Sequence, residues 1–247
     1  MNQLPCCDCG KDISRTALKC LFCGCELPTL PVRALRFRAE RVELFAKCES
    51  IPKIENVGTL VAHVIPSNAM NSEDSQINLG DATSLEPFGG YAEGSFNFHG
   101  LIRQRKSKDS TQAYIQIFRN GIIESAANVS RNSQEKIINF SYWEEEIIKQ
   151  VSEYISFLQN SNGKAPVQFL LSLLNVKDYF LDIPWGFHAF QRAPILDSTI
   201  LLPPVEFPVF TMDIKNGLKA SFDMIWNAGG FPGSFHYDEN GLWRELT

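Results

Sequence analysis

Apolar residues recur along this chain with the spacing of helices and strands. A spacing of three and four residues predicts helices over Arg36–Cys48, Tyr142–Gln159 and Asp213–Ala228. Continuous apolar runs predict buried strands over Val57–Ile65 and Val167–Leu174. The chain therefore combines both kinds of secondary structure.

Alternating apolar and polar positions predict a hairpin followed by a third strand. The hairpin strands are Ser95–Arg103 and Ala113–Arg119, joined by the charged tip Arg105–Thr111. Asn120-Gly121 is a strong turn signal, after which Ile122–Ala126 would return as the next strand. These three strands predict a meander, and we expect an α+β fold with a mainly antiparallel sheet and packed helices.

The helical pattern also predicts which residues are buried. The first helix would bury Ala39, Val42, Phe45 and Ala46, and would expose Arg36, Glu40, Arg41, Glu43 and Lys47. The second would bury Trp143, Ile147, Ile148, Val151, Ile155 and Leu158, expose Glu144, and begin at a Ser141 cap. The third would bury Leu218, Phe222, Ile225 and Trp226 behind an Asp213 cap.

Segments without periodicity separate these elements. Pro28–Pro31 is typical of a short stiff linker, because proline opposes helix continuation. Residues 67–87 are polar and predict a long loop, and the proline-rich residues 194–208 predict an extended connector. We expect a small N-terminal unit over residues 1–31 and one mixed domain over residues 32–247.

The N-terminal unit carries two C-x-x-C-G motifs, at residues 6–10 and 20–24. Zinc takes four tetrahedral ligands, and two cysteines separated by two residues can turn both sulfurs toward one ion. The spacing predicts a zinc ribbon whose ligands are Cys6, Cys9, Cys20 and Cys23. Cys7 and Cys25 lie one residue out of this spacing, so we interpret them as bystanders that could substitute during metal loading.

Other uses of these cysteines fit the sequence less well. Disulfide frameworks belong to secreted chains, and the N-terminus lacks the apolar stretch of a signal peptide. A redox dithiol needs one pair, whereas two pairs lie within twenty residues here. Four cysteine ligands leave no open position, so zinc would be structural and would supply folding energy to a segment too short for its own core. Cys48 is expected to be a small buried apolar residue.

Composition and charge restrict the class of protein. Hydrophobic residues make up 44% of the chain, and no apolar run is long enough to span a bilayer. These features predict a cytoplasmic protein without a membrane segment. The net charge is −5, so any nucleic-acid surface must be local. The candidate phosphate-binding residues are Arg33, Arg36, Arg38 and Arg41, with a second group at Arg103, Arg105, Lys106 and Lys108.

The chain offers little that indicates catalysis. None of the four histidines, His63, His99, His188 and His236, has a spacing typical of a catalytic pair. His63 and His99 fall on expected strands, where a histidine is usually a hydrogen-bonded structural group. His188 and His236 fall in loops, and either could act with an acid such as Asp238 in a hydrolase. No nucleotide-binding or hydrolase motif is present.

Several segments resemble a bacterial protein family. They are Phe37–Val42 with Pro52, Leu60–Pro66, Tyr114–Glu124, Phe222–Gly230 and Tyr237–Trp243. In order and spacing they are similar to the region that follows the N-terminal domain in Schlafen-type, AlbA-like DNA-binding proteins, over most of residues 32–247. The AlbA-like domain itself is replaced by the zinc ribbon, so the resemblance supplies no catalytic residue. It implies a portable module in a regulator or a stress or phage-defence component.

These observations favour a non-enzymatic zinc-ribbon binding module. Its partner would be nucleic acid or protein, contacted by the ribbon and the Arg33–Arg41 segment. One alternative is a protein-only interaction subunit of a bacterial defence assembly. The other is a hydrolase that uses the loop histidines.

Overall fold

The computed structural model describes residues 3–6, 9–14, 19–25, 29–50, 52–54, 57–70, 76–107, 110–130, 136–184 and 192–246. For residues 3–5 and 14 it describes the backbone only. Two of the cysteines and histidines discussed above, Cys7 and His188, lie outside these ranges, as does Lys108.

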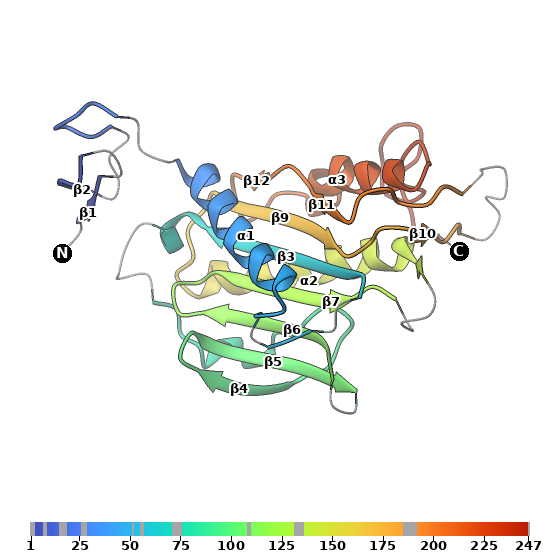
Figure 1. Cartoon of the computed structure of the whole chain (residues 1–247), viewed down its shortest axis with the longest axis horizontal. Coiled ribbons are helices and arrows are strands. Elements are labelled where there is room, and N and C mark those ends of the chain that lie inside the picture. Colours follow the sequence, from blue (N-terminus) through green and yellow to red (C-terminus); the bar gives the residue numbers. More distant parts are fainter. Residues whose placement is uncertain are drawn as a thin grey trace.

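A large sheet forms the centre of the molecule (Figure 1). Its strand order is β11-β9-β3-β7-β6-β5-β4, and β12 also pairs with β9; every pair in it is antiparallel. The strands are β3 (Thr59–Pro66), β4 (Glu93–Asn97), β5 (Gly100–Ser107), β6 (Ser110–Phe118), β7 (Ile123–Asn128), β9 (Val167–Leu174), β11 (Thr199–Leu201) and β12 (Val205–Phe207). Two smaller pairs lie outside it: β1 (Gln3–Pro5) with β2 (Asp12–Ser14), and β8 (Ile137–Ile138) with β10 (Phe180–Leu181). The predicted α+β class with a mainly antiparallel sheet is confirmed.

Helices cover both faces of the sheet. On one face α2 (Phe140–Asn160) and α3 (Ile214–Ala228) pack over the main core, which includes alternate residues of β3 such as Leu60 and Val64. On the other face α1 (Leu30–Ala46) packs over the intervening residues Val61 and Ile65. Because both faces are covered, β3 is buried along its whole length.

The first helix differs most from its prediction. It begins at Leu30, six residues before Arg36, because Pro31 occupies the first turn, where a missing N–H costs no helix bond. The expected linker therefore runs into the helix. Its buried residues are Ala34, Arg38 and Phe45, whereas Ala39 and Ala46 are exposed. Phe45 is buried and Val42 packs beside its cluster, as expected, but the rest of the buried face is formed by Ala34 and Arg38 instead of Ala39 and Ala46.

The other two helices match their predicted apolar stripes. All six stripe residues of α2 and all four of α3 are buried. Asp213 caps α3 as expected, accepting a hydrogen bond from the N–H of Asn216. The α2 cap is Asn139 rather than Ser141, and Glu144 is buried rather than exposed.

Three connections also differ from expectation. The predicted strand Ser95–Arg103 is two strands, β4 and β5, that meet at a tight turn where Gly100 has φ of 150°. The predicted loop 67–87 contains short helices η1 (Ser67–Met70) and η2 (Asp81–Ser84), and Ile77 and Leu79 join the main core. The connector 194–208 contains β11 and β12.

The N-terminal element has a small core of its own. Cys6, Ile13 and Cys20 form a buried cluster, with Cys25 packed against it. In Figure 1 this element lies beyond the start of α1, away from the sheet. So few apolar contacts cannot stabilise a fold alone, and this element needs a cross-link or a metal.

Candidate metal centre

Two loops of the N-terminal element have the same backbone geometry. In each, the first cysteine, Cys6 or Cys20, donates its N–H to the carbonyl five residues on and accepts from the N–H of the glycine four residues on. All four hydrogen bonds are 2.9 Å long. Gly10 and Gly24 have φ of 69° and 74°, a conformation that favours glycine. The two loops therefore form a matched pair of knuckles whose backbone geometry suits a metal site.

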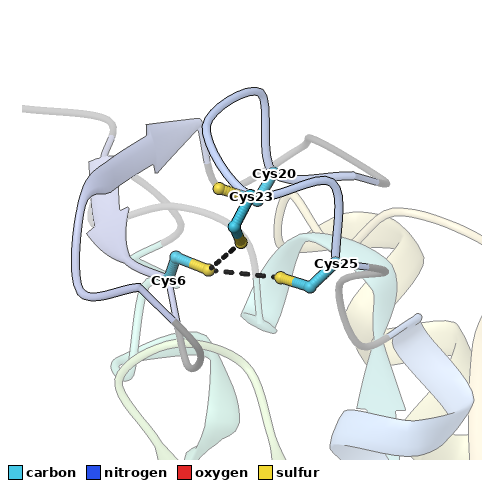
Figure 2. A group of neighbouring side chains, drawn as sticks. All are labelled: Cys6, Cys20, Cys23 and Cys25. Carbon is cyan, nitrogen blue, oxygen red and sulfur yellow. Dashed lines mark hydrogen bonds between the residues drawn. The ribbon is translucent and has the colours of Figure 1, made fainter.

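The knuckles bring their sulfurs together. The Sγ atoms of Cys6, Cys20, Cys23 and Cys25 all lie within 4.8 Å of one another, and Figure 2 shows Cys6 and Cys25 pointing toward each other beside Cys23. The Sγ of Cys9 lies 3.7 Å from that of Cys20. Five thiols therefore meet at one site, and a group of four of them could hold a metal ion.

The chemistry of the donor set fits a soft or borderline metal. Thiolate sulfur selects zinc, copper(I) or iron–sulfur centres over calcium and magnesium. Contacts with Cys6 and Cys23 raise the pKa of the Cys25 thiol, because neighbouring sulfurs oppose each other's ionisation. A cation is therefore needed to hold several thiolates so close together.

The predicted ligands Cys6, Cys20 and Cys23 are all in the group of four. Cys9 is the fourth predicted ligand, and it contacts this group through Cys20. Cys25 was expected to be a bystander, but it belongs to the group of four. The assignment of Cys6, Cys9, Cys20 and Cys23 as the ligands stays a prediction. Sequence spacing missed Cys25 because it considers only the two positions within each motif.

The four candidate phosphate-binding arginines do not form one exposed face. Arg38 is buried and donates to the carbonyl of Leu202. Arg41 makes two hydrogen bonds to the carboxylate of Glu124.

The other two members of the group lie at the surface to different degrees. Arg33 is partly buried and donates to the carbonyl of Met70, at 2.9 Å. Arg36 is exposed. Two of the four guanidinium groups are therefore occupied inside the protein, and the assignment of all four as phosphate-binding residues stays a prediction.

The second basic group is largely occupied as well. Arg103 is buried, donates to backbone carbonyls that include Leu85, and pairs with Glu86 at 2.8 Å. Arg105 donates to the carbonyl of Gly89. Lys106 is exposed, but it is one charge on a strand end.

His236, the one described histidine of the hydrolase hypothesis, is enclosed by backbone and aromatic groups. His236 is completely buried, stacks on Trp243 and contacts the backbone oxygens of Arg244 and Ser141. Asp238 instead accepts two backbone hydrogen bonds within its own turn. A nearby cavity of about 620 Å³ has no histidine in its lining. His236 and Asp238 therefore have separate hydrogen-bond partners and are not paired with each other.

A buried polar network under α1 went unnoticed in the sequence. The carboxylate of Glu124 on β7 accepts hydrogen bonds from Arg41 Nε and Nη2, His63 Nε2 and Tyr114 Oη, at 2.6 to 2.9 Å. Burial would raise the pKa of Glu124, but the hydrogen bonds and charges of His63 and Arg41 lower it to about 2. This network fastens α1, which follows the cysteine element, to the sheet.

A second buried carboxyl lies at the start of α2. Burial raises the pKa of Glu144 to about 8, and the charges of Asp223 and Glu145 act in the same direction. The indole N–H of Trp226 donates to it at 3.1 Å, and His236 Nε2 lies 3.7 Å from its other oxygen. Glu144 holds α2, α3 and the C-terminal segment together and does not line the nearby cavity.

Comparisons with known proteins give this chain no relative. Neither a family model, nor a curated protein, nor a solved structure matches it. The resemblance to Schlafen-type proteins is therefore untested and stays a prediction. Among the described residues, no helix has the length and apolar character needed to cross a membrane.

Proposed function

We propose that this chain is a non-enzymatic binding module in which zinc holds the N-terminal ribbon and the ribbon contacts a protein partner. The observation that carries the proposal is the tip of the second knuckle. Leu21 and Phe22 lie between two clustered cysteines, and their exposed fractions are 93% and 57%. Large apolar side chains held in water by a rigid turn are typical of a contact surface.

Zinc is the metal that the sulfur cluster fits best. Four cysteine sulfurs around one ion are the usual structural zinc site, and they leave no position for water or substrate. The small buried cluster of Cys6, Ile13 and Cys20 supports a structural role, since the metal would supply the missing folding energy.

A protein partner is favoured over nucleic acid by the placement of the cations. Arg38 and Arg41 are occupied internally, so the segment after the ribbon offers few free charges for phosphates. At the knuckle itself, Lys11 and Lys19 are exposed, and the Nζ of Lys11 lies 4.8 Å from the centre of the Phe22 ring. Two lysines beside an apolar tip suit a protein surface that is apolar with an acidic rim.

The other two hypotheses have less support. Membership of a bacterial defence assembly rests on the family resemblance alone. The hydrolase hypothesis needs an accessible base at His188 or His236, and His236, the one of these two that is described, is completely buried.

Co-purification from native cells tests the proposal. The double variant Leu21→Ser, Phe22→Ser should lose a stoichiometric protein partner that survives nuclease treatment, while keeping its zinc. Phe98→Ser is the matched control, because Phe98 is 89% exposed on the turn between β4 and β5, outside the N-terminal element. Fluorescence anisotropy with single- and double-stranded DNA and RNA should show no tight binding. Submicromolar affinity that falls steeply with salt would instead identify nucleic acid as the partner.

A further inference from the structure

The sulfur cluster contains one thiol more than a tetrahedral metal site uses. Cys6, Cys20 and Cys23 lie at its centre, and Cys9 and Cys25 both reach it. Cys25 belongs to the group of four sulfurs that lie within 4.8 Å of one another, whereas Cys9 was expected to complete the site from its spacing. Two cysteines therefore compete for one ligand position.

The distances between sulfurs allow both arrangements. In a tetrahedral site with metal–sulfur bonds of about 2.3 Å, neighbouring sulfurs lie about 3.8 Å apart. The distances Cys6–Cys23, at 3.6 Å, and Cys9–Cys20, at 3.7 Å, match two opposite edges of such a tetrahedron. The Sγ of Cys25 is 3.2 Å from that of Cys6, so Cys25 is already beside a central sulfur. Cys9 and Cys25 thus each lie beside one of the three central sulfurs.

The backbone of the second knuckle fixes Cys25 in that place. Its carbonyl accepts the hydrogen bond from the N–H of Cys20, at 2.9 Å. Lys11 holds the equivalent position in the first knuckle, where its carbonyl accepts from Cys6. At this position the first knuckle carries a lysine, whereas the second carries a thiol. Cys25 is half-buried against the other cysteines, as a ligand would be.

We propose that Cys9 and Cys25 are alternative fourth ligands of one metal site whose constant ligands are Cys6, Cys20 and Cys23. This inference rests on the proposed zinc site and deepens it. The site always keeps one unused thiol beside the metal ligands. When one of the two ligands departs, the other replaces it, so the metal keeps four sulfur ligands while one cysteine is exchanged for another.

Cobalt(II) titration of the full-length, reduced protein tests the proposal. Cobalt reports the number of sulfur ligands through its visible absorption, and competition with zinc gives the zinc affinity. Cys9→Ser and Cys25→Ser should each keep a four-sulfur spectrum and lower the zinc affinity by about tenfold or less. The double variant should lose the four-sulfur spectrum and lower the affinity by about 100-fold or more, because one of four ligands is then missing. Cys7→Ser and Cys48→Ser are the controls, and neither should change the spectrum.

Exchange kinetics give a second readout. Zinc transfer from the protein to a chromogenic chelator should be faster in Cys25→Ser than in the wild-type protein, because no second thiol is left to hold the ion when Cys9 departs. Cys48→Ser should transfer zinc at the wild-type rate.

Three results would overturn the proposal. Loss of the four-sulfur spectrum in Cys9→Ser alone would make Cys25 a bystander, and its loss in Cys25→Ser alone would do the same for Cys9. An unchanged spectrum in the double variant would exclude both. A wild-type protein that binds no metal through four sulfurs would contradict the zinc site itself, so failure of the proposed function is distinguishable from failure of this inference.

Discussion

Removing the charge of Glu124 is expected to destabilise the whole domain. Its carboxylate accepts four hydrogen bonds, two of them from the guanidinium of Arg41, and both Glu124 and His63 are fully buried. Glu124→Gln keeps the shape but replaces one acceptor oxygen with an N–H₂ group that faces other donors. It also leaves the Arg41 cation without its counter-charge.

The size of the effect follows from two independent arguments. Breaking a buried ion pair by removing one partner costs about 3–5 kcal/mol. The pKa of Glu124 falls from an ordinary value of 4.5 to about 2, which corresponds to about 3 kcal/mol of stability at neutral pH. Both energies are of the same size, so we expect Glu124→Gln to lower the free energy of unfolding by roughly 3 kcal/mol.

The sign of the pH dependence is fixed by the same shift. A carboxyl whose pKa is lower in the folded state stabilises the fold above its unfolded value, and this stability is lost as the pH falls from about 4.5 toward 2. The wild-type protein should therefore lose stability across this window, and Glu124→Gln should show a smaller loss.

Urea unfolding followed by tryptophan fluorescence at pH 7 and at several acidic pH values measures both quantities. Trp143 and Trp226 lie in the main core and report on it directly. Glu43→Gln is the matched control, because it removes a carboxylate from the exposed face of α1 and should leave the stability close to that of wild type. A cost for Glu124→Gln below about 1 kcal/mol, or an unchanged acid dependence, would refute the reasoning.

Three further predictions concern other parts of the fold. Glu144→Gln should raise stability at pH 8 and flatten the pH dependence of stability between about pH 4.5 and 8. As the pH rises through this window, the wild-type protein loses stability, because the carboxyl ionises in the unfolded state and not in the buried, folded one. Equal urea midpoints for both proteins at pH 8 would contradict this. Gly100→Ala should lower the free energy of unfolding in urea by more than about 2 kcal/mol, because a Cβ there would collide with the backbone of Ile117 and Gly100 has φ of 150°. A urea midpoint within error of wild type would argue against the β4–β5 turn. Zinc removal by a chelator should open the N-terminal element to proteolysis and leave the core tryptophan signal unchanged; simultaneous loss of both would show that the two parts unfold together.

The fold was predictable wherever one local pattern decides the structure. The stripes of α2 and α3, the run in β9 and the Asn120-Gly121 turn each depend on neighbours within a few residues, and each was found. The knuckle glycines were found for the same reason, since a C-x-x-C-G motif fixes its own turn.

The errors have a shared physical cause, which is pairing between distant residues. The sequence predicts that Arg41 faces solvent, because its partner Glu124 lies 83 positions away along the chain. Arg38 is satisfied by a carbonyl 164 positions away. Glu144 is buried because residues of α3 and the C-terminal segment close over it. Charge alone predicts exposure, and only the tertiary partner reverses that prediction.

The central claim is that one metal ion is held by four cysteine sulfurs in the N-terminal element. Zinc analysis together with X-ray absorption at the zinc edge, on the purified full-length protein, tests it most directly. We expect one zinc per chain with four sulfur neighbours at about 2.3 Å. Nitrogen or oxygen neighbours, or a reduced protein that binds no zinc, would contradict the claim.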